Sequence, residues 1–123
     1  MKQRVDAHDL SIYIEEVNRC NRSYFVQEAA ALSLLLTAEK EKAYYAQVAF
    51  EGIKDIYENP AQERLPHQDY GLSRAMMQLA LAMPYAWCRD HWSKEQLTYV
   101  ENKINEALES WLSYKHANFG DTR

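Results

Sequence analysis

The chain has 123 residues, enough for one compact domain or part of one, and 47% of them are apolar, which is enough for a core. It contains three glycines and three prolines, a composition that argues against a loop-rich or all-β fold. The net charge of −4 comes without a basic cluster, so we expect no nucleic-acid partner. No apolar window reaches the length of a membrane span, so we expect no membrane partner.

Cysteines, known motifs and the N-terminus bear on cofactors and location. Cys20 and Cys88 match neither a disulfide framework nor a metal signature, so we expect two ordinary, buried or half-buried thiols. No P-loop and no Ser-His-Asp arrangement is visible, and we predict no metal site and no cofactor. The first six residues lack the apolar centre of a signal peptide, so the sequence alone predicts a cytoplasmic protein.

The first third of the chain predicts an opening helix and then a buried one. Asp9 can cap the opening helix, which we expect to reach about residue 21. Ser23 can then cap a second helix over residues 24–36. Alanines and leucines cover most of the circumference of this second helix, which is typical of a helix inside a larger structure.

A helix of a different kind follows. Residues 37–42 (TAEKEK) are charged and can form a tight connection, although they are also compatible with helix. Residues 43–57 place apolar side chains on one stripe and charged side chains on the other, the pattern of an outer helix. Asn59 and Pro60 should end this helix, and residues 61–69 are the one clear loop.

The same pair of patterns returns in the second half. Residues 72–87 are apolar nearly all round, so we expect a buried helix. Pro84 removes a backbone donor and clashes with the preceding turn, so this helix should kink or end near Met83. Ser93 and Gln96 have the spacing of a capping box, which opens an amphipathic outer helix.

These patterns together predict an all-α fold. The order is an opening helix, then buried, amphipathic, loop, buried and amphipathic, with the last helix continuing to Leu112. We expect antiparallel helical hairpins with alternating inner and outer helices. Such hairpins build either a solenoid or bundle, or an α/α toroid, in which a barrel of inner helices is sheathed by outer ones.

Two stretches carry a family resemblance. Residues 79–96 (LALAMPYAWCRDHWSKEQ) place Tyr85 and Trp87 at the end of the second buried helix, and residues 34–49 hold a Leu-Leu-Leu-Thr run, a charged turn and then Tyr-Ala. Both stretches resemble hairpins in the α/α-toroid domains of polysaccharide lyases of the heparinase II/III and alginate lyase type. Ala86 stands where that family usually has Asp, and the earlier turn is longer and lacks the family's glycine.

The resemblance implies that residues 1–123 are the N-terminal fragment of a larger toroid domain, the alternative being a single all-helical domain. It also implies β-elimination on a glycan that contains uronic acid. In that reaction Asn, Arg or His neutralises the uronate carboxylate, Tyr or His removes the C5 proton, and the leaving oxygen is protonated. In such lyases these residues lie mostly after the first hairpins. We therefore expect this chain alone to be inactive, and the whole enzyme to be secreted or periplasmic.

Three places in the chain offer candidates for binding or turning over a polysaccharide substrate, and each has an ordinary structural alternative. The tail can present a carboxylate-binding Asn, or it can be a frayed polar terminus. The loop before the second buried helix can line a cleft, or it can be solvated. The aromatic residues of the resemblance can stack on sugar rings, or they can pack at the edge of the core. The candidates are His116 and Asn118, near Asp121, for catalysis, and His67, Tyr70, Tyr85 and Trp87 for substrate binding.

The turn before the last helix has its own alternatives. Asp90 and His91 lie next to each other there, but they do not have the spacing of metal ligands. We expect the neighbouring Trp92 to fill the hydrophobic position of the turn.

The second hypothesis belongs to a different class, a small helical-bundle module for protein–protein interaction without catalytic activity. Such a module would use the apolar helical edge where a further hairpin would otherwise belong, and it would form a homo-oligomer through that edge. A defined small oligomer with cooperative unfolding would favour it. An extension of the reading frame rich in Asn, His, Tyr and Arg would favour the lyase.

Overall fold

The computed structural model describes residues 1–8, 18–59 and 72–119, with side chains at 1–8, 22–59, 78–109 and Leu112. Every element in these ranges is a helix, so the predicted all-α class is confirmed. The predicted opening helix falls mostly on residues 9–17 and lies outside these ranges, as does the loop at 61–69. The elements are α1 (Lys2–Asp6), α2 (Asn18–Leu35), α3 (Glu39–Glu58), α4 (Leu72–Cys88), the 3-10 turn η3 (Arg89–His91) and α5 (Lys94–Phe119).

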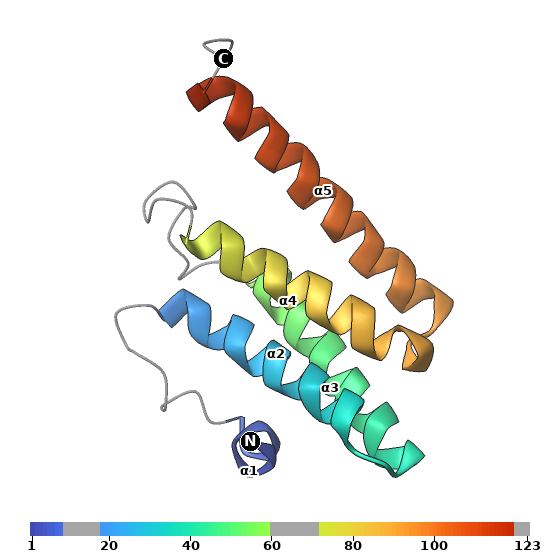
Figure 1. Ribbon diagram of the computed structural model, residues 1–123. Coiled ribbons are helices and arrows are strands. Elements are labelled where there is room, and N and C mark those ends of the chain that lie inside the picture. The colour runs from blue at the N-terminus through green and yellow to red at the C-terminus, as the bar shows by residue number, and fades with distance from the viewer. Residues whose placement is uncertain (9–17, 60–71, 120–123) are drawn as a thin grey trace.

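The helix α2 lies at the centre of the fold and packs on α1, α3 and α4. In Figure 1, α4 lies beside α2 and runs in the same direction, whereas α3 runs back behind them. The last helix, α5, runs antiparallel to α4 and continues beyond it, since α5 has 26 residues and α4 has 17. Thus α2 and α4 are parallel neighbours, and each is followed along the chain by an antiparallel helix.

Small side chains let α2 and α3 approach each other closely. Ala29 and Ala30 of α2 and Ala46 and Ala49 of α3 are completely buried, and such small side chains let the two backbones come near each other. Larger apolar side chains fill the space around these alanines: Val26, Leu32, Phe50, Ile53, Ile56, Leu81 and Val100. Among the described parts of the chain, no helix has both the length and the apolar composition that a membrane span requires.

The start of α2 differs from the prediction. The helix begins at Asn18, so the prediction that Ser23 caps it is wrong. Ser23 is completely buried inside the helix, where its hydroxyl accepts a hydrogen bond from Gln27 Nε2 at 3.0 Å. The Ser23 hydroxyl thus has a hydrogen-bond partner one turn further along the helix, so it is satisfied without lying at the helix end.

The connection between α2 and α3 is shorter than predicted. It comprises residues 36–38, and the charged stretch from Glu39 to Lys42 already belongs to α3, where acidic side chains suit the positive end of the helix dipole. The Lys42 ammonium donates to the carbonyls of Leu34 and Leu36, both at 3.0 Å. These bonds satisfy carbonyls at the end of α2, so the tight turn forms without a glycine.

The end of α3 agrees with the prediction. The helix ends at Glu58, and Asn59 is its C-cap residue. Arg22 of α2 donates to the carbonyls of Asp55 and Asn59 at 3.1 and 3.0 Å, which ties this end of α3 to α2. The local stop signal in the sequence is therefore reinforced by a side chain from the neighbouring helix.

Pro84 does not end α4. The helix continues for another turn to Cys88, so of the two predicted outcomes, a kink or an end near Met83, the end is wrong. Packing holds this last turn, because Cys88 is completely buried and the Tyr85 hydroxyl donates to Glu101 Oε2 of α5 at 2.6 Å. Contacts with α5 and with the core thus offset the backbone hydrogen bond that proline cannot make.

The capping box at the start of α5 is confirmed. The Gln96 backbone N–H donates to Ser93 Oγ at 3.1 Å, and the Ser93 N–H donates to Gln96 Oε1 at 2.9 Å. Two of the four N–H groups that lack partners at a helix start are thereby satisfied.

Replacing Ser93 with alanine should lower the free energy of unfolding by about 1 kcal/mol, because the N-cap oxygen is lost. Urea unfolding followed by circular dichroism measures the change. Ser93→Asp is the matched control, since aspartate also caps helices, and it should retain most of the stability. Equal losses in both variants would contradict a capping role.

Candidate functional site

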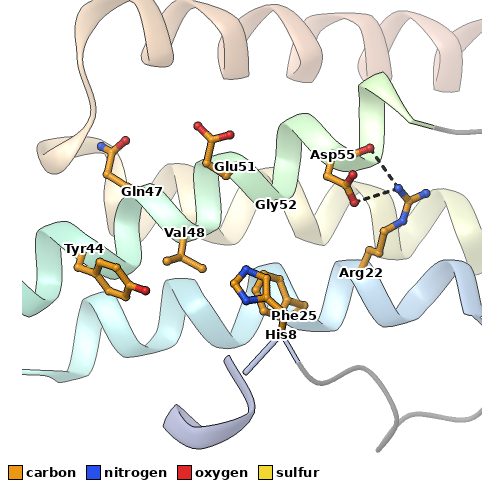
Figure 2. A pocket seen from close by; sticks show the side chains of 9 residues that line it. All are labelled: His8, Arg22, Phe25, Tyr44, Gln47, Val48, Glu51, Gly52 and Asp55. Carbon is orange, nitrogen blue, oxygen red and sulfur yellow. Dashed lines mark hydrogen bonds and ion pairs between the residues drawn. The ribbon is translucent and has the colours of Figure 1, made fainter. Parts of the chain in front are cut away.

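A groove of about 450 Å³ lies between α2, α3 and the end of α1 (Figure 2). It follows one face of α3, where Tyr44, Val48, Glu51 and Asp55 recur at helical spacing. The full set of lining residues is His8, Arg22, Phe25, Tyr44, Gln47, Val48, Glu51, Gly52 and Asp55.

The floor of the groove is apolar and is formed where α2 and α3 approach each other closely. Phe25 of α2 and Val48 and Gly52 of α3 contribute to it. A Cβ atom on Gly52 would lie 2.6 Å from Val26 Cγ2, so the missing side chain is what permits this approach. No pattern in the sequence predicts the groove, because a lone glycine within a helical pattern has no unique structural meaning.

Replacing Gly52 with alanine should lower the free energy of unfolding, even though alanine favours helix by about 1 kcal/mol. The clash with the stiff Val26 side chain should cost about 1–3 kcal/mol, which exceeds that gain. Adding Val26→Ala to Gly52→Ala should remove the clash, so the two substitutions should be strongly coupled in urea unfolding. A simple gain of stability in Gly52→Ala would contradict the observed approach of the helices.

His8 forms one wall of the groove. Its φ of 53° lies in the left-handed region, which is uncommon for a residue with a side chain. The backbone N–H of His8 donates to the Val5 carbonyl at 3.1 Å, and its ring stacks on Phe25 with centroids 5.0 Å apart. These contacts hold the imidazole over the apolar floor.

Some of the polar side chains at the ends and rim of the groove form hydrogen bonds or ion pairs, and one carboxylate forms none in the part of the chain that the structure describes. The Arg22 guanidinium and the Asp55 carboxylate form an ion pair at 3.2 Å at one end, as Figure 2 shows. Gln47 donates to the His91 carbonyl and to Gln96 Oε1, both at 3.1 Å. By contrast, Glu51 is exposed and makes no hydrogen bond or ion pair within the described ranges.

An apolar floor with a few polar groups around it is the arrangement of a small-molecule binding site. The lining set contains no serine, cysteine or lysine nucleophile, and its one histidine is stacked on a phenylalanine. In the described part of the chain, no group of three or more His, Cys, Asp or Glu side chains is placed to hold a metal ion. The groove therefore offers an apolar surface with a single unpaired carboxylate on its rim.

Two of the residues predicted to bind substrate are described, and neither lines the groove. The Tyr85 hydroxyl is bonded to Glu101, which raises its pKa, and the Arg89 guanidinium lies 4.6 Å from the centre of the Tyr85 ring. Trp87 is half-buried against the core. Both side chains thus take part in packing between α4, η3 and the rest of the fold.

The other predicted site residues cannot be placed as side chains. His67 and Tyr70 lie outside the described ranges, and so does Asp121. His116 and Asn118 belong to α5, which continues to Phe119, but their side chains are among those not described. Their proposed roles stay predictions.

The prediction for Trp92, in the turn before α5, is confirmed. Trp92 is 6% exposed, and its indole N–H donates to the Ala46 carbonyl at 2.9 Å, so it fills the hydrophobic position of the turn as expected.

Comparison of the chain with protein-family models, curated proteins and solved structures gives no match. The fold and the groove are therefore the features from which a function can be inferred.

Proposed function

We propose that this chain forms the opening part of an α/α-toroid domain of the polysaccharide-lyase type. The observation that supports the proposal is the parallel pairing of α2 and α4 (Figure 1). When antiparallel hairpins repeat with the inner helix first, successive inner helices must run in the same direction. In this reading α2 and α4 are inner helices, and α3 and α5 are their outer partners.

The distribution of contacts favours this layered arrangement over a simple up-and-down bundle. In such a bundle, each helix packs chiefly on the helix before and after it in the chain. Here α2 packs more extensively on α4 than α3 does, although α3 precedes α4 in the chain. In the proposed arrangement, the contact between α2 and α4 is the contact between two neighbouring hairpins.

One face of α4 has the character of an edge that another hairpin would cover. Leu79, Ala82 and Ala86 are exposed and lie on one stripe of the helix, and Leu79 is 40% exposed. Apolar stripes of this kind usually mark a contact surface. A further inner helix packed beside α4, on the side away from α2, would bury it.

The proposed chemistry follows the resemblance, a β-elimination on a polysaccharide that contains uronic acid. Asn118 and His116 stay the candidates for its catalytic groups in this chain, and His67, Tyr70, Tyr85 and Trp87 those for substrate binding. Most of the reaction's groups are expected on later hairpins, so the 123-residue chain alone should not cleave the substrate.

The test uses the polypeptide as its own source makes it, captured with an antibody raised against this chain. Its intact mass should be several times 14.4 kDa. On a panel of polyuronates it should release products with the ultraviolet absorbance of an unsaturated uronate. The same polysaccharides with reduced carboxyl groups are the control, since β-elimination requires the carboxyl group. A mass near 14.4 kDa, or no product from any polyuronate, would refute the proposal.

A second candidate function, an interaction module without catalytic activity, has its own supporting observation. Leu108 and Leu112 are 54% and 55% exposed and lie one turn apart on α5, which continues past α4. If the exposed leucines of α5 join two copies of the chain, analytical sedimentation should give a dimer, and Leu108→Glu should dissociate it. Glu109→Gln, which changes a neighbouring exposed residue, should leave the dimer intact. A monomer at all concentrations would exclude the homodimer.

A further inference from the structure

We propose that the groove between α2, α3 and the end of α1 binds a small organic cation with an apolar body. The proposal is independent of the proposed function, since the residues that line the groove include no residue of the α4 stripe and no predicted lyase residue. Its evidence is the size of the groove, its apolar floor and the balance of charge on its rim.

The size and floor of the groove fit the apolar body of a small molecule. Its volume of about 450 Å³ lies within the range of small-molecule sites in proteins. Phe25 and Val48 give it an apolar floor, and Gly52 lets α2 and α3 approach closely beneath that floor because it has no side chain. A ligand of the size of a substituted benzene ring would displace water from these apolar surfaces and from the stacked His8 ring, which favours binding.

The charges of the lining residues favour a positive ligand. Arg22 already donates to the Asp55 carboxylate and to two main-chain carbonyls, so its guanidinium has less capacity to bind an anionic ligand. That ion pair also compensates the charge of Asp55. The Glu51 carboxylate on the same face of α3 has no such partner within the described ranges, so the groove carries one uncompensated negative charge.

An aromatic side chain at the other end of the groove adds to this preference. Tyr44 is 53% exposed, and its ring packs edge-on against Tyr45 with centroids 4.9 Å apart. An exposed aromatic face attracts cations through its electron-rich centre. The groove therefore combines an apolar floor with an unpaired carboxylate and an accessible aromatic ring.

Three probes with the same aromatic body test the proposal: 2-phenylethylammonium, 2-phenylethanol and phenylacetate. Chemical-shift titration of the 123-residue chain should give the tightest binding for the cation, weaker binding for the alcohol and the weakest for the anion. We expect about a fivefold difference between cation and alcohol, from one exposed ion pair with Glu51. The shifts should centre on Phe25, Val48 and Gly52.

Two variants separate charge from shape. Glu51→Gln should remove most of the preference for the cation and leave binding of the alcohol nearly unchanged. Glu58→Gln changes the same charge on the same helix outside the groove, and it should keep the preference. Val48→Trp should fill the groove and weaken binding of all three probes, while circular dichroism verifies that each variant is folded.

Several results would overturn the proposal. One is equal affinity for the cation and the anion, and another is an equal effect of Glu51→Gln and Glu58→Gln. Failure of all three probes to bind would mean that the groove is not a small-molecule site. Self-association that Val48→Trp abolishes would mean that a second copy of the chain occupies the groove, which also refutes the proposal.

Discussion

Trp92→Ala is expected to be severely destabilising, with a loss of about 3–5 kcal/mol in the free energy of unfolding. The side chain is 6% exposed and packs edge-on against Phe50, with ring centroids 6.0 Å apart. Its indole N–H also donates to the Ala46 carbonyl at 2.9 Å. The substitution would therefore leave a cavity where the turn before α5 meets α3.

Trp92→Phe is the matched control for this experiment. Phenylalanine keeps an aromatic ring at the position and loses the indole donor, so the loss should be nearer to about 1–2 kcal/mol. Urea unfolding followed by circular dichroism and by fluorescence gives both values. Equal losses in the two variants would mean that the hydrogen bond, and not the packing of the indole, is responsible.

The second large effect is a loss of stability at alkaline pH. Burial raises the pKa of the Cys88 thiol from 9.0 to about 11, because the thiolate is poorly solvated between α2 and α4. Below pH 9 the thiol is protonated in both the folded and the unfolded chain. Between pH 9 and 11 the unfolded chain releases a proton that the folded chain retains. Stability should therefore fall across this interval, by about 2–3 kcal/mol at its upper end.

Cys88→Ala isolates this contribution. The variant should be less stable than the parent chain at neutral pH, because it loses buried volume, but its stability should fall less steeply from pH 9 to 11. The tyrosines add to the loss from pH 10 upwards, since burial raises the pKa of Tyr57 from 10.0 to about 12 and the unfolded chain releases that proton first. Unfolding in urea at a series of pH values measures both curves. Parallel curves would show that Cys88 has no part in the alkaline loss.

Features of the fold that depend on neighbouring residues in the chain could be predicted from the sequence. Ser93 and Gln96 satisfy each other's backbone groups within one turn, so their spacing alone identified the start of α5. Asn59 and Pro60 marked the end of α3 in the same way. The all-α class followed from apolar periodicity over long segments.

Other boundaries were wrong because contacts from distant parts of the chain decide them. Ser23 looks like a cap by composition, yet it is buried inside α2. Pro84 is typical of a kink or a helix end, and the helix does not end there because the turn after it is held by the bond between Tyr85 and Glu101. Lys42 satisfies carbonyls at the end of α2, which lets α3 begin before the predicted residue.

The groove could not be predicted from the sequence at all. It joins a turn after α1, the middle of α2 and one face of α3, and no motif links these three segments. In the sequence, nothing distinguishes His8 and Glu51 from other polar residues. They become candidates for binding because α2 and α3 cross closely at Gly52.

The parallel pairing of α2 and α4 has a consequence for how the chain folds. The hairpin of α2 and α3 joins neighbouring segments and can form early, whereas α4 must return across the whole length of α3 before it meets α2. Contacts between distant segments slow folding, because more chain entropy is lost before they form. During synthesis, the side of α2 that faces α4 therefore stays uncovered until Cys88 has left the ribosome. Over that interval we expect the nascent chain to be a substrate for chaperones that bind exposed apolar helices.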